Sequence, residues 1–172
     1  MILVRDTIPC TPRFHLRSDS IESLWVVISP QKIPRDARHI LLGTIYHPSK
    51  ARDAFLTDYI SLCIDKIKSK HCNTAVMIAG DFNTFKEGCL CRMYSLKQIV
   101  WKPTRDNSIL DKVYTSIPQW YKPPDIVSHI GKSDHNSVLL SPKQNKNYSP
   151  TNRVVTTRCA SYHNRLNLRM KL

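Results

Sequence analysis

The fold of this chain is set by the ten residues TAVMIAGDFN, at positions 74–83. The uncharged run TAVMIAG is typical of a strand buried on both faces, and Asp81 and Asn83 follow it at once. A carboxylate and an amide are costly to bury without partners. We therefore expect both groups to face a phosphate at the end of this strand.

The segments before this strand predict an α/β fold. Residues 23–29 (SLWVVIS) and 39–46 (HILLGTIY) are short apolar runs that predict two neighbouring strands. Residues 50–70 place apolar side chains at helical spacing among charged ones and predict an amphipathic helix. Strand, helix and strand in this order predict a right-handed crossover with parallel pairing. The carboxyl end of such strands is where ligands collect.

The segments after it predict further strands. Residues 89–101 indicate a short helix and then a strand. In NSILDKVYTS, alternation places Lys112 and Tyr114 on one face and Asp111 and Val113 on the other. The runs DIVSHI and HNSVLLS predict two more strands, and GKSDH lies between them at residues 131–135.

The charge of the chain favours an anionic partner. Lys and Arg outnumber Asp and Glu by 26 to 13 in 172 residues, which favours nucleic acid. Residues 141–172 hold seven basic residues and no acid, so residues 1–140 carry 19 minus 13, or +6. We expect one domain over residues 1–140 and a basic, flexible tail or linker over 141–172. That tail is either simply solvated or a nucleic-acid contact.

Targeting signals are weak throughout. The six cysteines form no paired CxxC pattern, so reduced thiols in an intracellular, nuclear or cytoplasmic protein are expected and secretion is not. MILVR is too short for a signal peptide. No apolar run approaches the roughly 20 residues that span a bilayer, so no membrane partner is expected.

Polar groups at the strand ends predict a site for phosphodiester chemistry. Hydrolysis of a phosphodiester needs charge compensation, a base for water and hydrogen-bond donors to the phosphate. Each group alone has a simpler interpretation: an Asx turn for DFN, an exposed loop for SDH, a solvent-facing acid or a packed tyrosine. The ordered set is the stronger signal, and it comprises Tyr46, Asp81, Asn83, Asp111, Ser133, Asp134 and His135.

That set resembles the endonuclease/exonuclease/phosphatase (DNase I-like) family. The stretches ESLWV, GTIYHPS, IAGDFN, KPTRDNSILDKVYT and GKSDHNSVL are most similar to the endonuclease domain of non-LTR (LINE-type) retrotransposons. The likeness covers residues 1–140 and is most specific in the last three stretches. It implies a four-layer α/β sandwich built around two sheets.

The resemblance also implies roles for individual residues. Asp81 would orient and deprotonate the attacking water, and Asn83 would donate to the same transition-state oxygens. Tyr46 and His135 would contact the phosphate, and Asp111 would hold His135 in one tautomer. Three further residues are implied at the site: Asp134 as a carboxylate on the metal side, and Thr104 and Ser133 as residues that contact DNA or brace the site.

The family's metal-binding Glu has no counterpart in the chain. That Glu lies on strands that precede the part of the fold which the first residues resemble, so we expect a partial sandwich that lacks its first strands. Glu22 lies in a strand that the family uses structurally, and it is not a substitute. The resemblance implies Mg²⁺ (or Mn²⁺) as cofactor. Because the metal-binding Glu is missing, we expect an impaired activity.

The resemblance implies an endonuclease that nicks DNA and exposes a 3′ hydroxyl for reverse transcription. The reverse transcriptase of the parent elements is absent here, and we expect a monomer. Two alternatives stay open: a non-catalytic nucleic-acid-binding remnant, and a phosphatase of the same fold. Trp101 and Trp120, each beside basic residues, are interpreted as core or loop anchors in preference to base-stacking groups. His47 is assigned no role.

Overall fold

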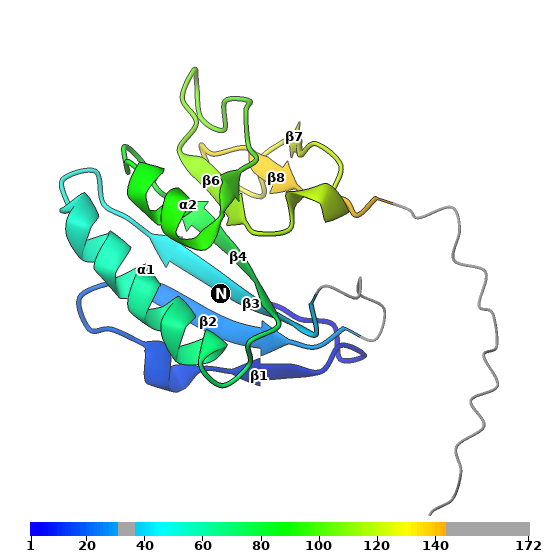
Figure 1. Cartoon of the computed structure of the whole chain (residues 1–172). Coiled ribbons are helices and arrows are strands. Elements are labelled where there is room, and N and C mark those ends of the chain that lie inside the picture. The colour runs from blue at the N-terminus through cyan, green and yellow to red at the C-terminus, as the bar shows by residue number, and fades with distance from the viewer. Residues whose placement is uncertain (31–36, 144–172) are drawn as a thin grey trace, which may run out of the picture.

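A computed structural model describes residues 1–30 and 37–143 of the chain (Figure 1). The predicted tail at 141–172 therefore lies almost entirely outside the described residues. In chain order, the elements are β1 (Cys10–Pro12), the 3₁₀ turn η1 (Phe14–Leu16), β2 (Ser23–Ile28), β3 (His39–Tyr46), α1 (Asp53–Lys68), β4 (Thr74–Asp81), α2 (Gly88–Tyr94), β5 (Lys97–Gln98), β6 (Asp111–Thr115), the 3₁₀ turn η2 (Pro118–Trp120), β7 (Asp125–Val127) and β8 (Ser137–Leu139).

Six of the strands form one mixed sheet in the order β1-β2-β3-β4-β6-β5. β3 and β4 pair in parallel through the α1 crossover, as predicted, and the other neighbours in this sheet are antiparallel. β7 and β8 form a separate two-stranded antiparallel sheet. The α/β class is therefore confirmed, while the sequence did not predict β1.

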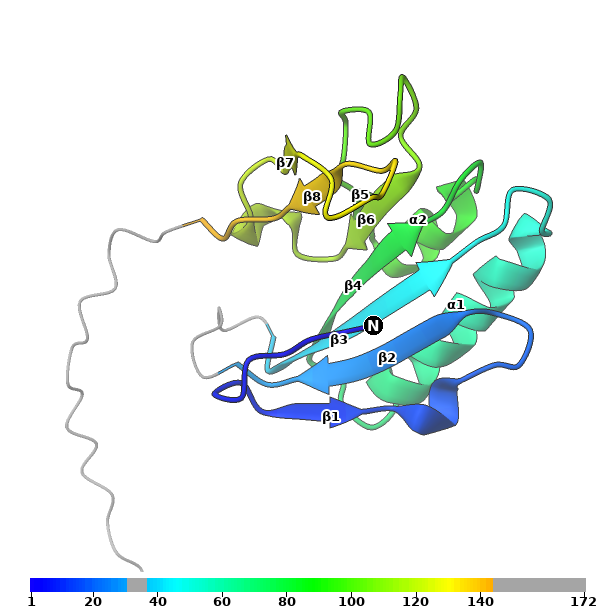
Figure 2. The ribbon, with the colours of Figure 1, turned by 180° about the vertical axis from the view of Figure 1, so that it is seen from behind.

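The two helices cover one face of the six-stranded sheet (Figure 1), and Figure 2 shows the sheet from behind. Because side chains alternate between the faces of a strand, one set points under the helices and forms the main core. Among its fully buried members are Leu41, Ile60, Val76, Ile78 and Tyr114. A smaller buried cluster on the other face comprises Ala37, Ile40, Ala75 and Ile117.

The tryptophan prediction is wrong at one of its two positions. Trp101 is 75% exposed, because it lies in the segment that follows β5 and reaches no core cluster. Trp120 packs against the smaller cluster, as an anchor would. Within the described residues, no helix is both long enough and apolar enough to cross a membrane.

In the parallel pair of β3 and β4, the backbone of β3 leaves no room for a side chain at Gly80. A Cβ atom at this position would lie 1.8 Å from the carbonyl oxygen of Ile45, and the backbone adopts φ +156°. Both facts exclude an ordinary side chain, because the atom in the way belongs to the backbone of the neighbouring strand and cannot turn aside. Gly80 therefore sets the spacing of the strands one residue before Asp81.

We expect Gly80→Ala to destabilise the protein by about 1–3 kcal/mol or more, because the two strands must move apart to admit the methyl group. Urea unfolding followed by circular dichroism measures this change. Gly88→Ala is the matched control, since nothing lies within 4 Å of a Cβ at Gly88 and the residue starts α2. Equal stabilities of the two variants would contradict the steric account of Gly80.

Candidate active site at one edge of the sheet

Three of the predicted residues lie side by side across neighbouring strands. Tyr46 pairs with Asp81, and Asp81 pairs with Asp111, in the register of β3, β4 and β6. Paired residues of adjacent strands point to the same face of a sheet. Tyr114 packs in the core beneath the helices, so Asp111, three residues before it, points to the opposite face. The row of Tyr46, Asp81 and Asp111 therefore shares the face away from the helices.

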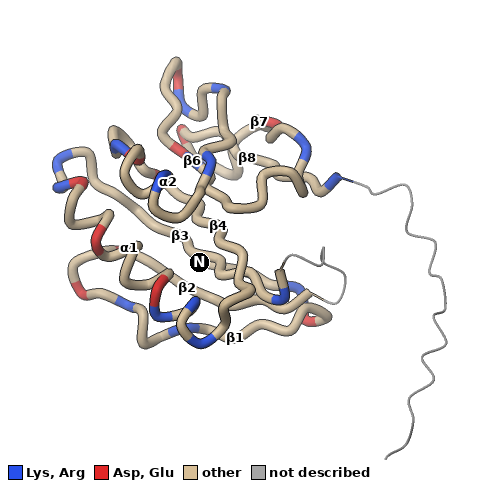
Figure 3. Tube along the Cα trace, viewed as in Figure 1, with Lys and Arg blue, Asp and Glu red and all other residues tan. Residues whose placement is uncertain are grey.

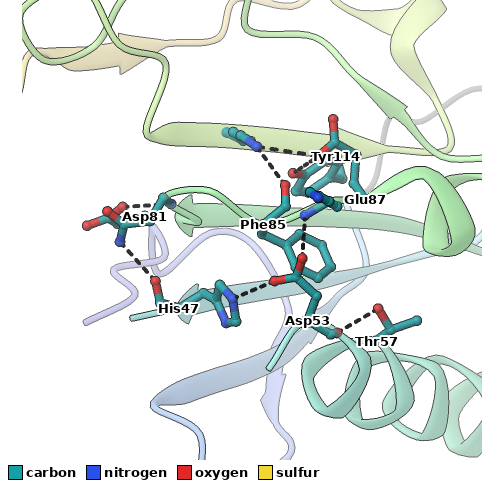
Figure 4. Close-up of polar contacts among 10 residues, drawn as sticks. His47, Asp53, Thr57, Asp81, Phe85, Glu87 and Tyr114 are labelled. Atoms are coloured by element: carbon teal, nitrogen blue, oxygen red, sulfur yellow. Dashed lines mark hydrogen bonds and ion pairs between the residues drawn. The ribbon is translucent and has the colours of Figure 1, made fainter. Parts of the chain in front are cut away.

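The DFN segment is a tight turn that fixes both of its polar residues. Asn83 has a left-handed backbone (φ 45°), and its N–H donates to Oδ1 of Asp81 at 3.2 Å. The Asn83 side chain donates from Nδ2 to the carbonyl oxygen of His47 at 2.8 Å. The His47 N–H in turn donates to the carbonyl oxygen of Asp81 at 2.8 Å. Figure 4 shows this linked set beside the labelled Asp81 and His47.

His135 joins the row through an ion-pair contact with Asp111. Its Nδ1 lies 2.8 Å from Oδ2 of Asp111, with both side chains mostly buried. The backbone N–H of His135 donates to the hydroxyl of Ser133 at 3.1 Å. The carboxylate therefore orients the ring, and the hydroxyl of Ser133 stabilises the turn that carries it. The structure thus brings His135 to the strand row, although the two lie 24 residues apart in sequence.

Thr104 is fully buried and binds backbone groups. Its Oγ1 accepts hydrogen bonds from the N–H groups of Leu110 and Asp111, at 3.2 and 3.0 Å. Its carbonyl oxygen accepts from the N–H of Asn136 at 2.7 Å. Of the two roles that the resemblance implies, bracing the site agrees with this burial, because the hydroxyl faces the backbone of β6.

Asp134 makes a different contact from the one that the resemblance implies. Its Oδ2 lies 2.8 Å from the guanidinium of Arg105, and both side chains are substantially exposed. Within residues 1–30 and 37–143, no three His, Cys, Asp or Glu side chains gather closely enough to hold a metal ion. The backbone carbonyl of Glu22 accepts from the N–H of Tyr46. The described residues therefore do not fit a metal site of three protein ligands.

Sequence reasoning missed a second group of residues beneath the DFN turn. His47 is only 3% exposed and bonds Asp53 at the start of α1. On the other side, Lys112 donates from Nζ to the carbonyl oxygen of Phe85 at 3.0 Å and approaches Glu87. Burial, and next the Glu87 carboxylate, raise the pKa of Tyr114, which keeps its phenol neutral. The available sequence signal for His47 was its position directly after Tyr46.

Basic residues lie at both ends of the six-stranded sheet. Figure 3 shows Lys and Arg on loops at the end of the sheet where β3 and β4 finish, and also on segments near the opposite end. α1, for example, carries Lys66 and Lys68 in its last turn. Basic residues therefore lie near the site but are not confined to it.

Comparison with known proteins supports the fold. No protein-family profile matches the chain, and no curated protein matches it. Among solved structures, the chain is similar to the endonuclease domain of TRAS1, a telomere-specific non-LTR retrotransposon. The TM-score is 0.62 at 12% identity, over 83% of this chain and 72% of that one. The chain therefore shares the DNase I-like fold of that domain, as its sequence predicts.

We expect Thr104→Val to destabilise the protein by about 1–3 kcal/mol, because it leaves the partly buried N–H groups of Leu110 and Asp111 without their acceptor. Thr104→Ser keeps the hydroxyl and serves as the control. Thermal or urea unfolding measures both variants. A Val variant as stable as the Ser variant would show that Thr104 does not brace β6.

Proposed function

We propose that this chain is a nuclease that hydrolyses phosphodiester bonds in DNA. The observation that carries the proposal is a row of a phenol and two carboxylates across β3, β4 and β6, with an imidazole bonded to one carboxylate and an amide in the turn that follows the other. Asp81 and Asn83 share one turn, Tyr46 and Asp111 flank Asp81, and His135 is bonded to Asp111. The fold shared with a retrotransposon endonuclease domain agrees with this chemistry.

Each side chain has a role in the proposed reaction. Asp81 accepts a proton from water, whose oxygen forms a bond to phosphorus while the bond to the 3′ oxygen breaks. The products are a 3′ hydroxyl and a 5′ phosphate, with the leaving oxygen protonated by solvent. Asn83, Tyr46 and His135 donate hydrogen bonds to the phosphate oxygens, which carry the charge that develops in the transition state.

The proposed substrate follows from charge. A phosphodiester backbone is a polyanion, and the chain carries a formal net charge of +13. Trp101, which is exposed beside Lys102, adds an aromatic surface of the kind that stacks on unpaired bases. DNA therefore suits this chain better than a small phosphorylated substrate.

A dependence on Mg²⁺ or Mn²⁺ belongs to the proposal through the family resemblance. When bound, such an ion offsets the charge on the phosphate. The described residues do not form a site of three ligands, and Arg105 pairs with the Asp134 carboxylate that the family places on the metal side. The proposed step therefore uses only side chains of the chain, and assays in EDTA and in MgCl₂ test the metal requirement.

A second candidate is favoured by the same ion pair. If Arg105 keeps Asp134 engaged, the chain binds DNA through its basic surface and cleaves it poorly or not at all. Binding without nicking is the outcome that distinguishes this candidate from the nuclease.

We expect the wild-type chain to nick supercoiled plasmid and Asp81→Asn to lower the rate at least ~100-fold, because the amide cannot accept the proton from water. Gel electrophoresis of nicked circles measures the rate. Asp58→Asn, an equal charge change on an exposed residue of α1, is the control and should nick like the wild type. Plasmid retarded in a gel-shift assay but never nicked would favour the binding protein and contradict the nuclease.

A further inference from the structure

The backbone of His47 is a contact shared by both polar residues of the DFN turn. Its N–H donates to the carbonyl oxygen of Asp81, and its carbonyl oxygen accepts from Nδ2 of Asn83, each at 2.8 Å. The second bond fixes the plane of the Asn83 amide, since one of its two N–H groups is already engaged. The other N–H and the carbonyl oxygen of that amide keep their hydrogen-bonding capacity for a ligand. Any movement of His47 therefore moves the Asn83 side chain.

The imidazole of His47 is anchored on the side away from the turn. Its Nε2 lies 3.1 Å from Oδ1 of Asp53, the first residue of α1, and its ring packs edge-on against Phe85 with centroids 5.4 Å apart. The other oxygen of Asp53 accepts the backbone N–H of Lys86 at 3.2 Å. Figure 4 shows Asp53 between His47 and the loop that carries Phe85.

These hydrogen bonds hold the loop of residues 81–86 at both of its ends. The backbone of His47 binds its start, at Asp81 and Asn83, and Asp53 binds its end, at Lys86. The His47 side chain joins the two anchors and is almost entirely buried. The Asp53 side chain is 35% exposed, so the pair is only partly buried, and its loss would leave the buried His47 imidazole without this partner.

We propose that His47 and Asp53 are a positioning pair that holds the Asn83 amide in the geometry which phosphodiester cleavage requires. This inference rests on the proposed function, and it adds two residues that do not touch the substrate. The Asn83 amide can donate to transition-state oxygens only if it is already oriented, and a misplacement of about 1 Å can cost ~100-fold in rate. The pair therefore acts on the rate of the chemical step more than on DNA affinity.

The test compares His47→Ala with His47→Gln. We expect His47→Ala to lower kcat for plasmid nicking about 10- to 100-fold with KM nearly unchanged. Gln places its amide nitrogen as many bonds from Cβ as Nε2 of His, so it can donate to Asp53 and should restore most of the rate. His15→Ala, an exposed histidine on η1, is the control and should match the wild type.

A second readout does not depend on activity. In ¹⁵N–¹H NMR spectra, His47→Ala should shift the side-chain amide signals of Asn83 and speed hydrogen exchange at Lys86, and His15→Ala should change neither. Suppose that the wild-type chain nicks DNA, but His47→Ala and His47→Gln are as active as each other or lose activity through KM alone. The positioning role is then wrong, and the nuclease proposal stands.

If the wild-type chain does not nick DNA, the proposed function fails and the NMR spectra decide on the pair. Unchanged Asn83 signals in His47→Ala would then overturn it. Should His47→Ala fail to fold, Asp53→Asn replaces it, with a smaller loss of rate expected because its oxygen still accepts from Lys86.

Discussion

The close pairing of β3 and β4 is the constraint on which the site depends. With no side chain at Gly80, the backbone of β4 approaches Ile45 and brings Tyr46 beside Asp81. The same approach lets the N–H of His47 reach the carbonyl oxygen of Asp81, and the turn at Asn83 closes on His47. A wider spacing would separate the phenol, the carboxylate and the amide together, because Tyr46 and Asp81 form the last pair of the two strands and Asn83 follows it.

The carboxylates near the site differ in what they bind, and this difference supports their separate roles. Asp111 faces His135, Asp134 faces Arg105, and Asp53 faces His47, so each of these three has a basic side chain as partner. Asp81 instead accepts the backbone N–H of Asn83 at one oxygen. A carboxylate with a neutral, local partner keeps more capacity to accept a proton or a hydrogen bond from water. This difference agrees with the proposed role of Asp81 as the base.

Much of this arrangement was predictable because it depends on local periodicity. The alternation in NSILDKVYTS placed Asp111 opposite Tyr114, and the strand–helix–strand order gave the parallel pairing that aligns Tyr46 with Asp81. The partners of His47 and Asp134 were not predictable, because a side chain's tertiary neighbour leaves no periodic trace in the sequence. The prediction for Trp101 was wrong for a related reason. An indole is more often packed than exposed, and the path of its loop decides whether this one is buried.

Titration of ¹⁵N-labelled protein with a short DNA duplex at low salt, followed by NMR, tests whether these groups surround a single phosphate-binding site. The account predicts saturable shifts that are largest for the Asn83 side-chain amide, the His135 imidazole and the backbone of Tyr46, with Lys66 and Lys68 at the far end of α1 little affected. Shifts that map instead to α1 and β1, and leave Asn83 and His135 unchanged, would contradict it.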